Sequence, residues 1–125
     1  NVTHGTVTDQ VRGNVVALYI EDKNMSPHQA ELLSEYGPVS DCDVRTFSGY
    51  IKTSQQCNPI FISEREDYKQ NSLLYDGDLI DADKWYYFAY TYAVYGDTDN
   101  HRAHIQLGYC RGAQVYVDDV TDKPL

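Results

Sequence analysis

Apolar and polar positions alternate with a period of two along most of the 125-residue chain. This alternation is typical of β-strands that bury one face. The clearest run spans 14–22, where Val16, Leu18 and Ile20 share one face. Similar runs, separated by turn-forming Asn, Pro, Gly and Asp residues, occupy positions 42–57, 58–65, 72–75, 83–95, 103–109 and 113–120. Roughly eight short strands of this kind predict a mainly β chain, an antiparallel β-sandwich or jelly roll in one domain, 1–125.

One segment has helical signals instead. Ser26 is a good N-cap, and Gln29 three residues later completes a capping box. Gly37 and Pro38 are typical of a helix end, because glycine adopts the left-handed conformation and proline cannot continue a helix. The sequence therefore predicts one short helix over about 27–36, connecting strands at one end of the sandwich.

The charge balance narrows the possible partners. The formal net charge is −9, with ten Lys and Arg residues and no basic run. Nucleic acids and anionic membrane surfaces attract clustered positive charge, so we expect neither as a partner. No stretch is long and apolar enough to span a membrane. The chain begins without Met, and Asn1-Val2-Thr3 is an N-glycosylation sequon, so we expect a secreted monomer.

The three cysteines form no CxxC motif, and their spacing does not suggest a zinc site. Cys42 and Cys57 are equidistant from Gly49-Tyr50, where two strand-like runs meet. In a hairpin that turns there, the two cysteines would lie opposite each other, within reach of a disulfide. We therefore predict a Cys42–Cys57 disulfide with Cys110 as a spare thiol. In a reducing compartment all three would instead be small buried apolar residues.

The run DKWYYFAYTYAVY at 83–95 is unusually rich in aromatic side chains. In a strand, Tyr86, Phe88 and Tyr90 would share one continuously bulky face, which we interpret as core. The other face would carry Trp85 and Tyr87 at its end, above a floor of small residues: Ala89, Thr91 and Ala93.

A floor of small residues beside aromatic rings suits a shallow groove for a sugar, whose C–H face stacks on rings while its hydroxyls meet polar groups. His104 and Gln106 on the following strand could supply those polar groups. The sequence thus predicts a ligand groove formed by Trp85, Tyr87, His104 and Gln106. The alternative is that the tyrosines have a high strand propensity and are half exposed without binding anything.

Residues 61–120 resemble the second half of the β-jelly-roll carbohydrate-binding modules attached to xylanases and related glycosidases. The matching stretches are FISERED, SLLYDGDL, DKWYYFAYTY, AHIQLGY and VYVDDV. This resemblance implies a glycan partner and no catalysis. We expect no catalytic cofactor; the resemblance implies a structural calcium ion near Asp118, which matches the acid of the closing strand.

A small secreted domain with few cysteines is also similar in format to effectors of plant-pathogenic fungi, rust fungi in particular. Some of these have jelly-roll folds similar to sugar-binding modules and cupins, and some are recognised by host immune receptors. This likeness implies a virulence or avirulence role and a host protein receptor as partner. We predict that Arg111 and Gln114, on a polar loop before the last strand, contact such a protein.

Enzymatic interpretations find little support. His101 and His104 are three apart, so on a strand they would face opposite ways and could not share a metal ion. Glu64, Glu66 and Asp67 could be paired acids of a glycosidase, but such a cluster is more typical of a solvated edge. The acidic run at 75–83 lacks the EF-hand spacing. We expect a sugar-binding module, or alternatively an interaction protein that uses the jelly roll only as a scaffold; a glycoside-active enzyme comes third.

Overall fold

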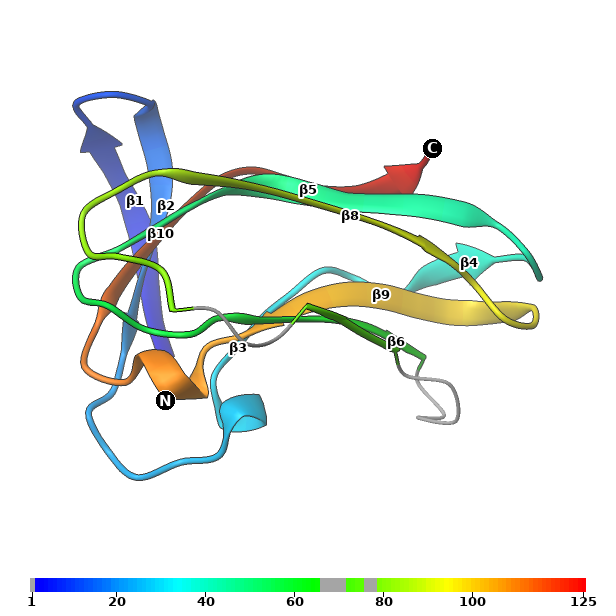
Figure 1. Cartoon of the computed structure of the whole chain (residues 1–125), viewed down its shortest axis with the longest axis horizontal. Helices are drawn as coiled ribbons and strands as arrows, with labels where there is room; N and C mark the ends of the chain where they lie inside the picture. The colour runs from blue at the N-terminus through cyan, green and yellow to red at the C-terminus, as the bar shows by residue number, and fades with distance from the viewer. Residues whose placement is uncertain (1, 66–71, 76–78) are drawn as a thin grey trace.

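The computed structural model describes residues 2–65, 72–75 and 79–125, which form two antiparallel sheets packed face to face (Figure 1). Sheet A has the strand order β1-β2-β10-β5-β8. Sheet B has the order β3-β9-β6-β7, and β4 also pairs with β9. The predicted mainly β, antiparallel sandwich is thus confirmed. The strands are β1 (Val2–Asp9), β2 (Gly13–Ile20), β3 (Glu31–Leu33), β4 (Gly37–Val39), β5 (Val44–Thr53), β6 (Ile60–Arg65), β7 (Ser72–Tyr75), β8 (Tyr86–Ala93), β9 (Thr98–Gln106) and β10 (Gln114–Pro124).

The predicted helix over 27–36 is wrong. Only the 3₁₀ turn η1 (Pro27–Gln29) forms, although Gln29 does accept a hydrogen bond from the Ser26 amide, as a capping box requires. The chain then becomes extended and pairs β3 with the edge of β9, so that sheet hydrogen bonds replace helical ones. A second 3₁₀ turn, η2 (Gly108–Cys110), precedes β10. No helix in the described part of the chain is long and apolar enough to cross a membrane.

Strand β5 runs straight through the position where we expected a hairpin. Phe47 and Ile51 point into the core on either side of Gly49, and β5 pairs with β10 on one side and β8 on the other. Gly49 serves a close approach rather than a turn. A Cβ atom there would lie 2.9 Å from Val120 Cγ2 and 3.0 Å from Val120 Cα. Val120 comes this close because β10 has a bulge between Asp118 and Thr121.

An aromatic cluster joins the two sheets. The ring centroids of Phe61 and Phe88 are 4.6 Å apart, those of Phe47 and Phe88 are 5.3 Å apart, and Phe47 meets Phe61 edge-on at 6.2 Å. Phe47 and Phe88 belong to sheet A, and Phe61 belongs to sheet B. On β10, Val115 and Val117 are buried and Tyr116 points outward, which confirms the predicted faces of the closing strand.

The predicted Cys42–Cys57 disulfide is wrong. Cys57 instead bonds to Cys110, with their Cα atoms 5.1 Å apart, and Cys42 is a free, exposed thiol. Because β5 is one unbroken strand of 10 residues, Cys42 and Cys57 lie beyond its opposite ends, too far apart to bond. The disulfide ties the segment after β5 to η2 at one end of the sandwich.

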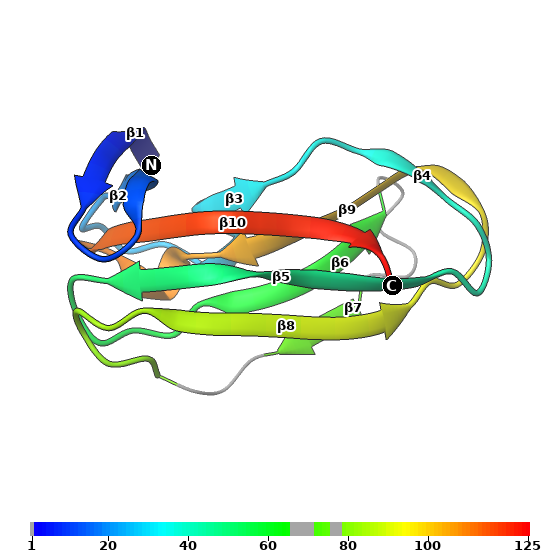
Figure 2. The same cartoon turned by 90° about the horizontal axis from the view of Figure 1, so that it is seen from above.

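The first two strands form a hairpin that leaves the plane of sheet A. Viewed from above, β10, β5 and β8 run side by side, while β1 and β2 turn away at one end (Figure 2). The pairing of β2 with β10 extends from Gln114 to Val117 of β10 and then stops. This early divergence leaves the rest of β10 at the border of the sheet.

We expect Gly49→Ala to lower the free energy of unfolding by about 1–3 kcal/mol, because the added methyl group would overlap the backbone of Val120. Gly5→Ala is the matched control, since a Cβ there meets nothing within 4 Å. Urea denaturation of both variants measures the difference. Equal stabilities would show that the bulge of β10 yields easily.

Replacing Cys57 and Cys110 together by Ala should lower the free energy of unfolding by about 2–5 kcal/mol, because the bond closes a loop between residues 53 apart. Cys42→Ser, at an exposed position, should change it by less than about 0.5 kcal/mol. Guanidinium denaturation under non-reducing conditions compares them. A larger loss in the Cys42 variant would contradict the observed pairing.

Candidate functional site

The aromatic run forms β8, and its two faces are those the alternation predicts. Phe88 is 5% exposed, and Tyr86 and Tyr90 are half-buried against the core. Tyr87 is 62% exposed on the opposite face. The small residues that follow it on that face are also exposed: Ala89, Thr91 and Ala93.

The predicted groove does not form, because its four residues lie on opposite sides of the sandwich. Trp85 and Tyr87 border the outer face of sheet A, whereas His104 and Gln106 belong to β9 in sheet B. Strand β9 follows β8 in the sequence but crosses to the other sheet instead of pairing with it. The outer face of each sheet must therefore be considered separately.

On the outer face of sheet A, the aromatic residues hold the turn between β1 and β2. Trp85 Nε1 donates a hydrogen bond to Asp9 Oδ2 at 3.0 Å, and Lys52 pairs with the same carboxylate. The Arg12 guanidinium lies 3.5 Å from the ring centroid of Tyr50. The hydrogen bond from Lys52, together with those from the turn amides, holds the pKa of Asp9 well below its usual range. These contacts fix the turn against sheet A and leave the rings of Tyr50 and Trp85 only half-exposed. We call this group, Asp9, Arg12, Tyr50, Lys52 and Trp85, the clamp.

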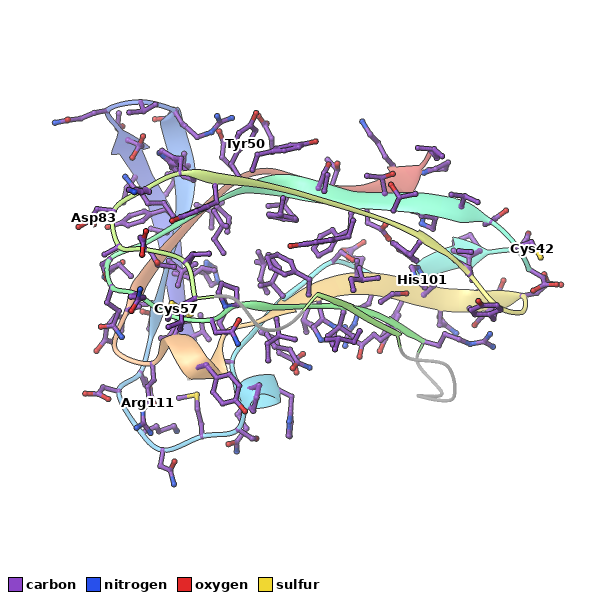
Figure 3. All side chains as sticks on the ribbon, viewed as in Figure 1. Cys42, Tyr50, Cys57, Asp83, His101 and Arg111 are labelled. Atoms are coloured by element: carbon purple, nitrogen blue, oxygen red, sulfur yellow. A yellow bond between two sulfur atoms is a disulfide. The ribbon has the colours of Figure 1, made fainter. Side chains whose placement is uncertain are left out.

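The ring of Tyr87 lies beside the clamp but is not covered by it. Its centroid is 5.1 Å from that of Tyr50, which lies on the outer side of sheet A (Figure 3). One exposed ring beside a strip of Ala and Thr offers a ligand a single flat contact. The outer face of sheet A thus has one element of the predicted groove but not its polar side.

On the outer face of sheet B, one row of side chains crosses four strands in register. Leu33 of β3 lies opposite His104 of β9, His104 lies opposite Ile62 of β6, and Ile62 lies opposite Leu73 of β7. Leu33 is 44% exposed and Leu73 is 59% exposed. We call this the central row. It is flanked on one side by Glu31 and Gln106 and on the other by Arg102 and Glu64.

Contacts with buried polar groups hold the polar side chains of this face in place. His104 is only 2% exposed and Glu64 only 5% exposed, although both point outward from sheet B. The Glu64 carboxylate pairs with Arg102 and lies 3.2 Å from His104 Nδ1, and Gln106 Nε2 lies 3.2 Å from His104 Nε2. The Arg102 guanidinium also lies 4.2 Å from the ring centroid of Tyr36. A buried polar floor therefore positions two partly exposed groups, the Gln106 amide and the Arg102 guanidinium, whose side chain is 16% exposed.

Burial shifts the titration of this floor. It lowers the pKa of His104, a shift that the neighbouring Glu64 carboxylate partly opposes. Burial also raises the pKa of Glu31, and the negative charge of Glu64 adds to this effect. Near neutral pH His104 is therefore uncharged, and the Glu64–Arg102 pair carries no net charge.

A second polar cluster lies between the sheets around His101 (Figure 3). Ser63 Oγ is 2.9 Å from His101 Nε2, and His101 Nδ1 is 3.8 Å from Asp122 Oδ2. This arrangement of Ser, His and Asp is not a catalytic triad, because Ser63 is 6% exposed and Asp122 accepts its hydrogen bonds from Tyr92 and Arg45 instead. The inward His101 and the outward His104 confirm that these two histidines face opposite ways.

The other predicted site residues lie apart from Tyr87 and the central row or outside the described residues. The Asp118 carboxylate accepts a hydrogen bond from Arg12 Nε at 2.8 Å, and calcium at this position stays a prediction. Among the described residues, no group of three or more His, Cys, Asp and Glu side chains could hold a metal ion. Arg111 and Gln114 are both exposed, beside the buried Cys110 and Ala113. The sequon residue Asn1, the acids Glu66 and Asp67, and residues 76–78 of the acidic run lie outside the described residues.

Comparison with known proteins identifies the fold. No protein-family model matches the sequence, and no curated protein matches it. Among solved structures, the CBM22-1 xylan-binding domain of Paenibacillus barcinonensis Xyn10C matches with a TM-score of 0.69 at 14% identity, covering 99% of this chain and 81% of that one. A family 4 carbohydrate-binding module matches with a TM-score of 0.68 at 9% identity, covering 99% and 94% of the two chains.

A larger protein contains a similar domain. The Clostridium thermocellum endo-1,4-β-D-xylanase 10B, in a structure of its CBM22-1 and GH10 modules with xylohexaose, matches with a TM-score of 0.75 at 13% identity. The match covers 100% of this chain but 25% of that one. These likenesses show that the chain has the β-sandwich jelly-roll fold of carbohydrate-binding modules.

The burial of His101 and His104 should make the stability of the fold depend on pH. Burial lowers the pKa of His101 and of His104, so below about pH 6.5 the unfolded chain binds protons that the folded chain does not. The free energy of unfolding should therefore fall as the pH drops from 7.5 to 5. Glu31, whose pKa is raised, acts in the opposite direction, because folding favours its protonated form.

Thermal denaturation across this pH range tests the assignment. His101→Gln should reduce the loss of stability on acidification, whereas Glu31→Gln should increase it, since it removes the opposing group. His4→Gln, at an exposed position, should leave the pH dependence as in the parent protein. Identical pH profiles for all four proteins would contradict the proposed origin of the effect.

Proposed function

We propose that this protein binds a polysaccharide chain without modifying it, and that the outer face of sheet B is the binding surface. The observation that carries this proposal is the in-register central row, in which the exposed Leu33 and Leu73 and the half-buried Ile62 lie beside Arg102 and Gln106. Its fold, shared with a xylan-binding domain and with a module in a xylohexaose complex, supports a sugar as the ligand.

The chemistry of the face suits a sugar chain. Pyranose rings have apolar C–H surfaces, for which Leu33, Ile62 and Leu73 provide a matching strip. Their hydroxyls need donors and acceptors, which Gln106 and Arg102 offer on the two sides of that strip. Because the floor beneath is already packed, these polar groups lose little freedom when a ligand arrives. The strip crosses four strands, so it can contact several sugar units in succession.

We propose further that the protein acts outside the cell. Disulfides form and persist in oxidising compartments, and the Cys57–Cys110 bond supports such a location. A role as a fungal effector, and recognition through Arg111 and Gln114 by a host receptor, stay predictions from the sequence.

The binding face can be located with three variants. Gln106→Ala and Leu73→Ala should each weaken binding of xylohexaose by about three- to tenfold, the loss expected for one hydrogen bond or one apolar contact. Tyr87→Ala, on the opposite face, should bind like the parent protein. Isothermal titration calorimetry measures the affinities, and a glycan array comes first in case another sugar is preferred.

The outcomes separate the alternatives. Loss of binding in Tyr87→Ala alone would move the site to sheet A. Absence of binding to every glycan on the array would refute the sugar-binding proposal and favour a protein-interaction scaffold.

A further inference from the structure

Strand β8 is an open edge of sheet A. It is the last strand in the order of that sheet and pairs, among the residues that the structure describes, with β5 alone. Figure 2 shows β8 at the border of the sheet, beyond β10 and β5. Its pairing with β5 runs from Tyr86 to Ala93 without a shift of register. The other long side of β8 therefore has no partner strand.

The backbone groups that point to this open side can be assigned. Val94, directly after β8, donates its N–H to the Asp43 carbonyl at 2.8 Å and accepts from the Cys42 amide at 2.9 Å, so both groups face β5. Residues of an antiparallel strand face one neighbour and then the other in turn. The next outward-facing carbonyl, that of Tyr95, is occupied, because it accepts from Arg65 Nη1 at 2.7 Å. Four exposed residues thus present free backbone groups, and we call them the β8 edge: Tyr87, Ala89, Thr91 and Ala93.

This edge has none of the usual protection against pairing. Edge strands are commonly short, or contain Lys, Pro or a bulge. Strand β8 has eight residues, YYFAYTYA, without a charged residue or a proline. The nearest charged residues along the chain are Lys84 before it and Asp97 after it. Two copies of a chain with a net charge of −9 can therefore meet along β8 itself without placing like charges opposite each other.

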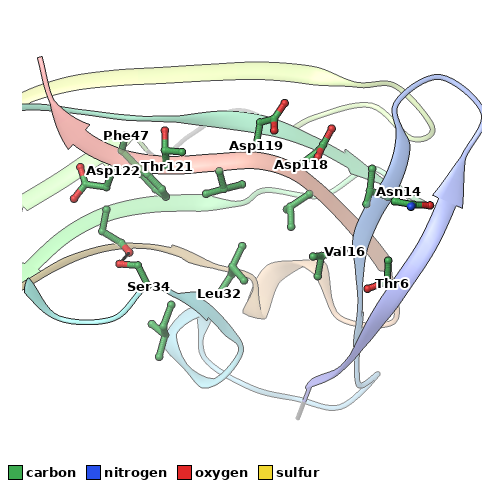
Figure 4. Close-up of a pocket in the computed structure, with 15 residues that line it drawn as sticks. Thr6, Asn14, Val16, Leu32, Ser34, Phe47, Asp118, Asp119, Thr121 and Asp122 are labelled. Carbon is green, nitrogen blue, oxygen red and sulfur yellow. Dashed lines mark hydrogen bonds between the residues drawn. The ribbon is translucent and has the colours of Figure 1, made fainter.

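The opposite side of the sandwich is less suited to an added strand. Between β10 and β3 lies a cavity of about 360 Å³, whose lining includes Asp118, Asp119 and Asp122 (Figure 4). The Asp122 carbonyl already accepts a hydrogen bond from Arg45 Nη2 at 2.9 Å, and Pro124 has no N–H to donate. The uncharged β8 edge is therefore the better place for strand pairing.

We propose that two copies of this chain pair antiparallel through their β8 edges, in place of the monomer expected from the sequence. In the register that fits, Tyr87 of one copy lies opposite Ala93 of the other, and Ala89 lies opposite Thr91. Residues placed in this way exchange both of their backbone hydrogen bonds. The one large ring of the edge, 62% exposed in the single chain, then faces a small side chain on both sides of the two-fold axis. The edge is therefore complementary to itself, as an isologous contact requires.

The inner side of β8 favours the same contact. Tyr86 and Tyr90 are half-buried and, together with Phe61 and Pro59, line a cavity of about 370 Å³ between the sheets. A strand added to β8 would cover more of these rings, and burial of apolar surface is the main favourable term in most protein association.

The dimer would also orient the sheets. Because outward-facing residues pair with outward-facing ones, the outer faces of sheet B in the two copies point the same way. Where sheet B binds a polysaccharide as proposed above, the dimer presents two binding faces to it, and linked sites raise the overall affinity. The pairing itself does not rest on sugar binding.

Analytical ultracentrifugation at several protein concentrations should show a monomer–dimer equilibrium. Thr91→Lys should raise the dissociation constant at least about tenfold, because the two added charges would lie beside the two-fold axis. Thr3→Lys is the matched control and should dimerise like the parent protein, since it makes the same change at an exposed position of β1, the other edge strand of sheet A. Added salt should strengthen the dimer, because it screens repulsion between two acidic chains.

Cysteine cross-linking tests the register. Ala89→Cys and Thr91→Cys are made separately in a Cys42→Ser background, since the two positions would lie opposite each other across the dimer and within disulfide reach. A mixture of the two variants should form a covalent dimer on mild oxidation. Each variant alone should form far less, because its two cysteines would lie diagonally, at the limit of that reach.

Three results would overturn the proposal. A parent protein that stays monomeric at every concentration would show that the edge does not pair. Equal effects of Thr91→Lys and Thr3→Lys would place the contact elsewhere. Cross-linking of either single variant as readily as of the mixture would exclude the self-complementary register. No sugar is present in these measurements, so none of these results bears on the sugar-binding face.

Discussion

The packing of Phe47, Phe61 and Phe88 between the sheets is the contact on which the rest of the structure depends. It joins β5 and β8 of sheet A to β6 of sheet B. Because strand side chains alternate, burying Phe88 exposes Tyr87, and burying Phe61 turns Ile62 outward. A slip of one residue in either strand would exchange its two faces. The core therefore determines what each outer face can present to a ligand.

The alternation in the sequence was enough to predict the faces of individual strands. It correctly assigned Phe88 to the interior and Tyr87 to the surface, and it correctly placed Val115 and Val117 on the buried face of the last strand. It could not predict which strands would be neighbours, because a period of two carries no information about pairing. His104 and Gln106 were therefore expected beside Tyr87, although β9 lies in the other sheet.

Other errors came from local signals that longer-range contacts override. Gly49 has the sequence signal of a turn residue, but the structure needs glycine there because a side chain would collide with Val120 of β10. The capping box of Ser26 and Gln29 is real, yet pairing of β3 with β9 ends the helical turn after three residues. The Cys57–Cys110 bond joins residues 53 apart in the sequence. At such a separation, spacing alone does not favour one pairing of the three cysteines over another. The strand at 2–9 was not predicted, because it pairs with β2 along its whole length but is exposed at nearly every position, so its sequence has no apolar face that would reveal a strand.

The charge distribution explains why a strongly acidic chain can present a surface suited to uncharged sugars. On the outer face of sheet B, Glu64 is neutralised by Arg102, and burial keeps His104 uncharged near neutral pH. On the outer side of sheet A, Asp118 and Asp119 of β10 both contact the Arg12 guanidinium. The buried groups beneath the proposed sugar-binding face therefore add no net charge to it, although the chain as a whole carries −9.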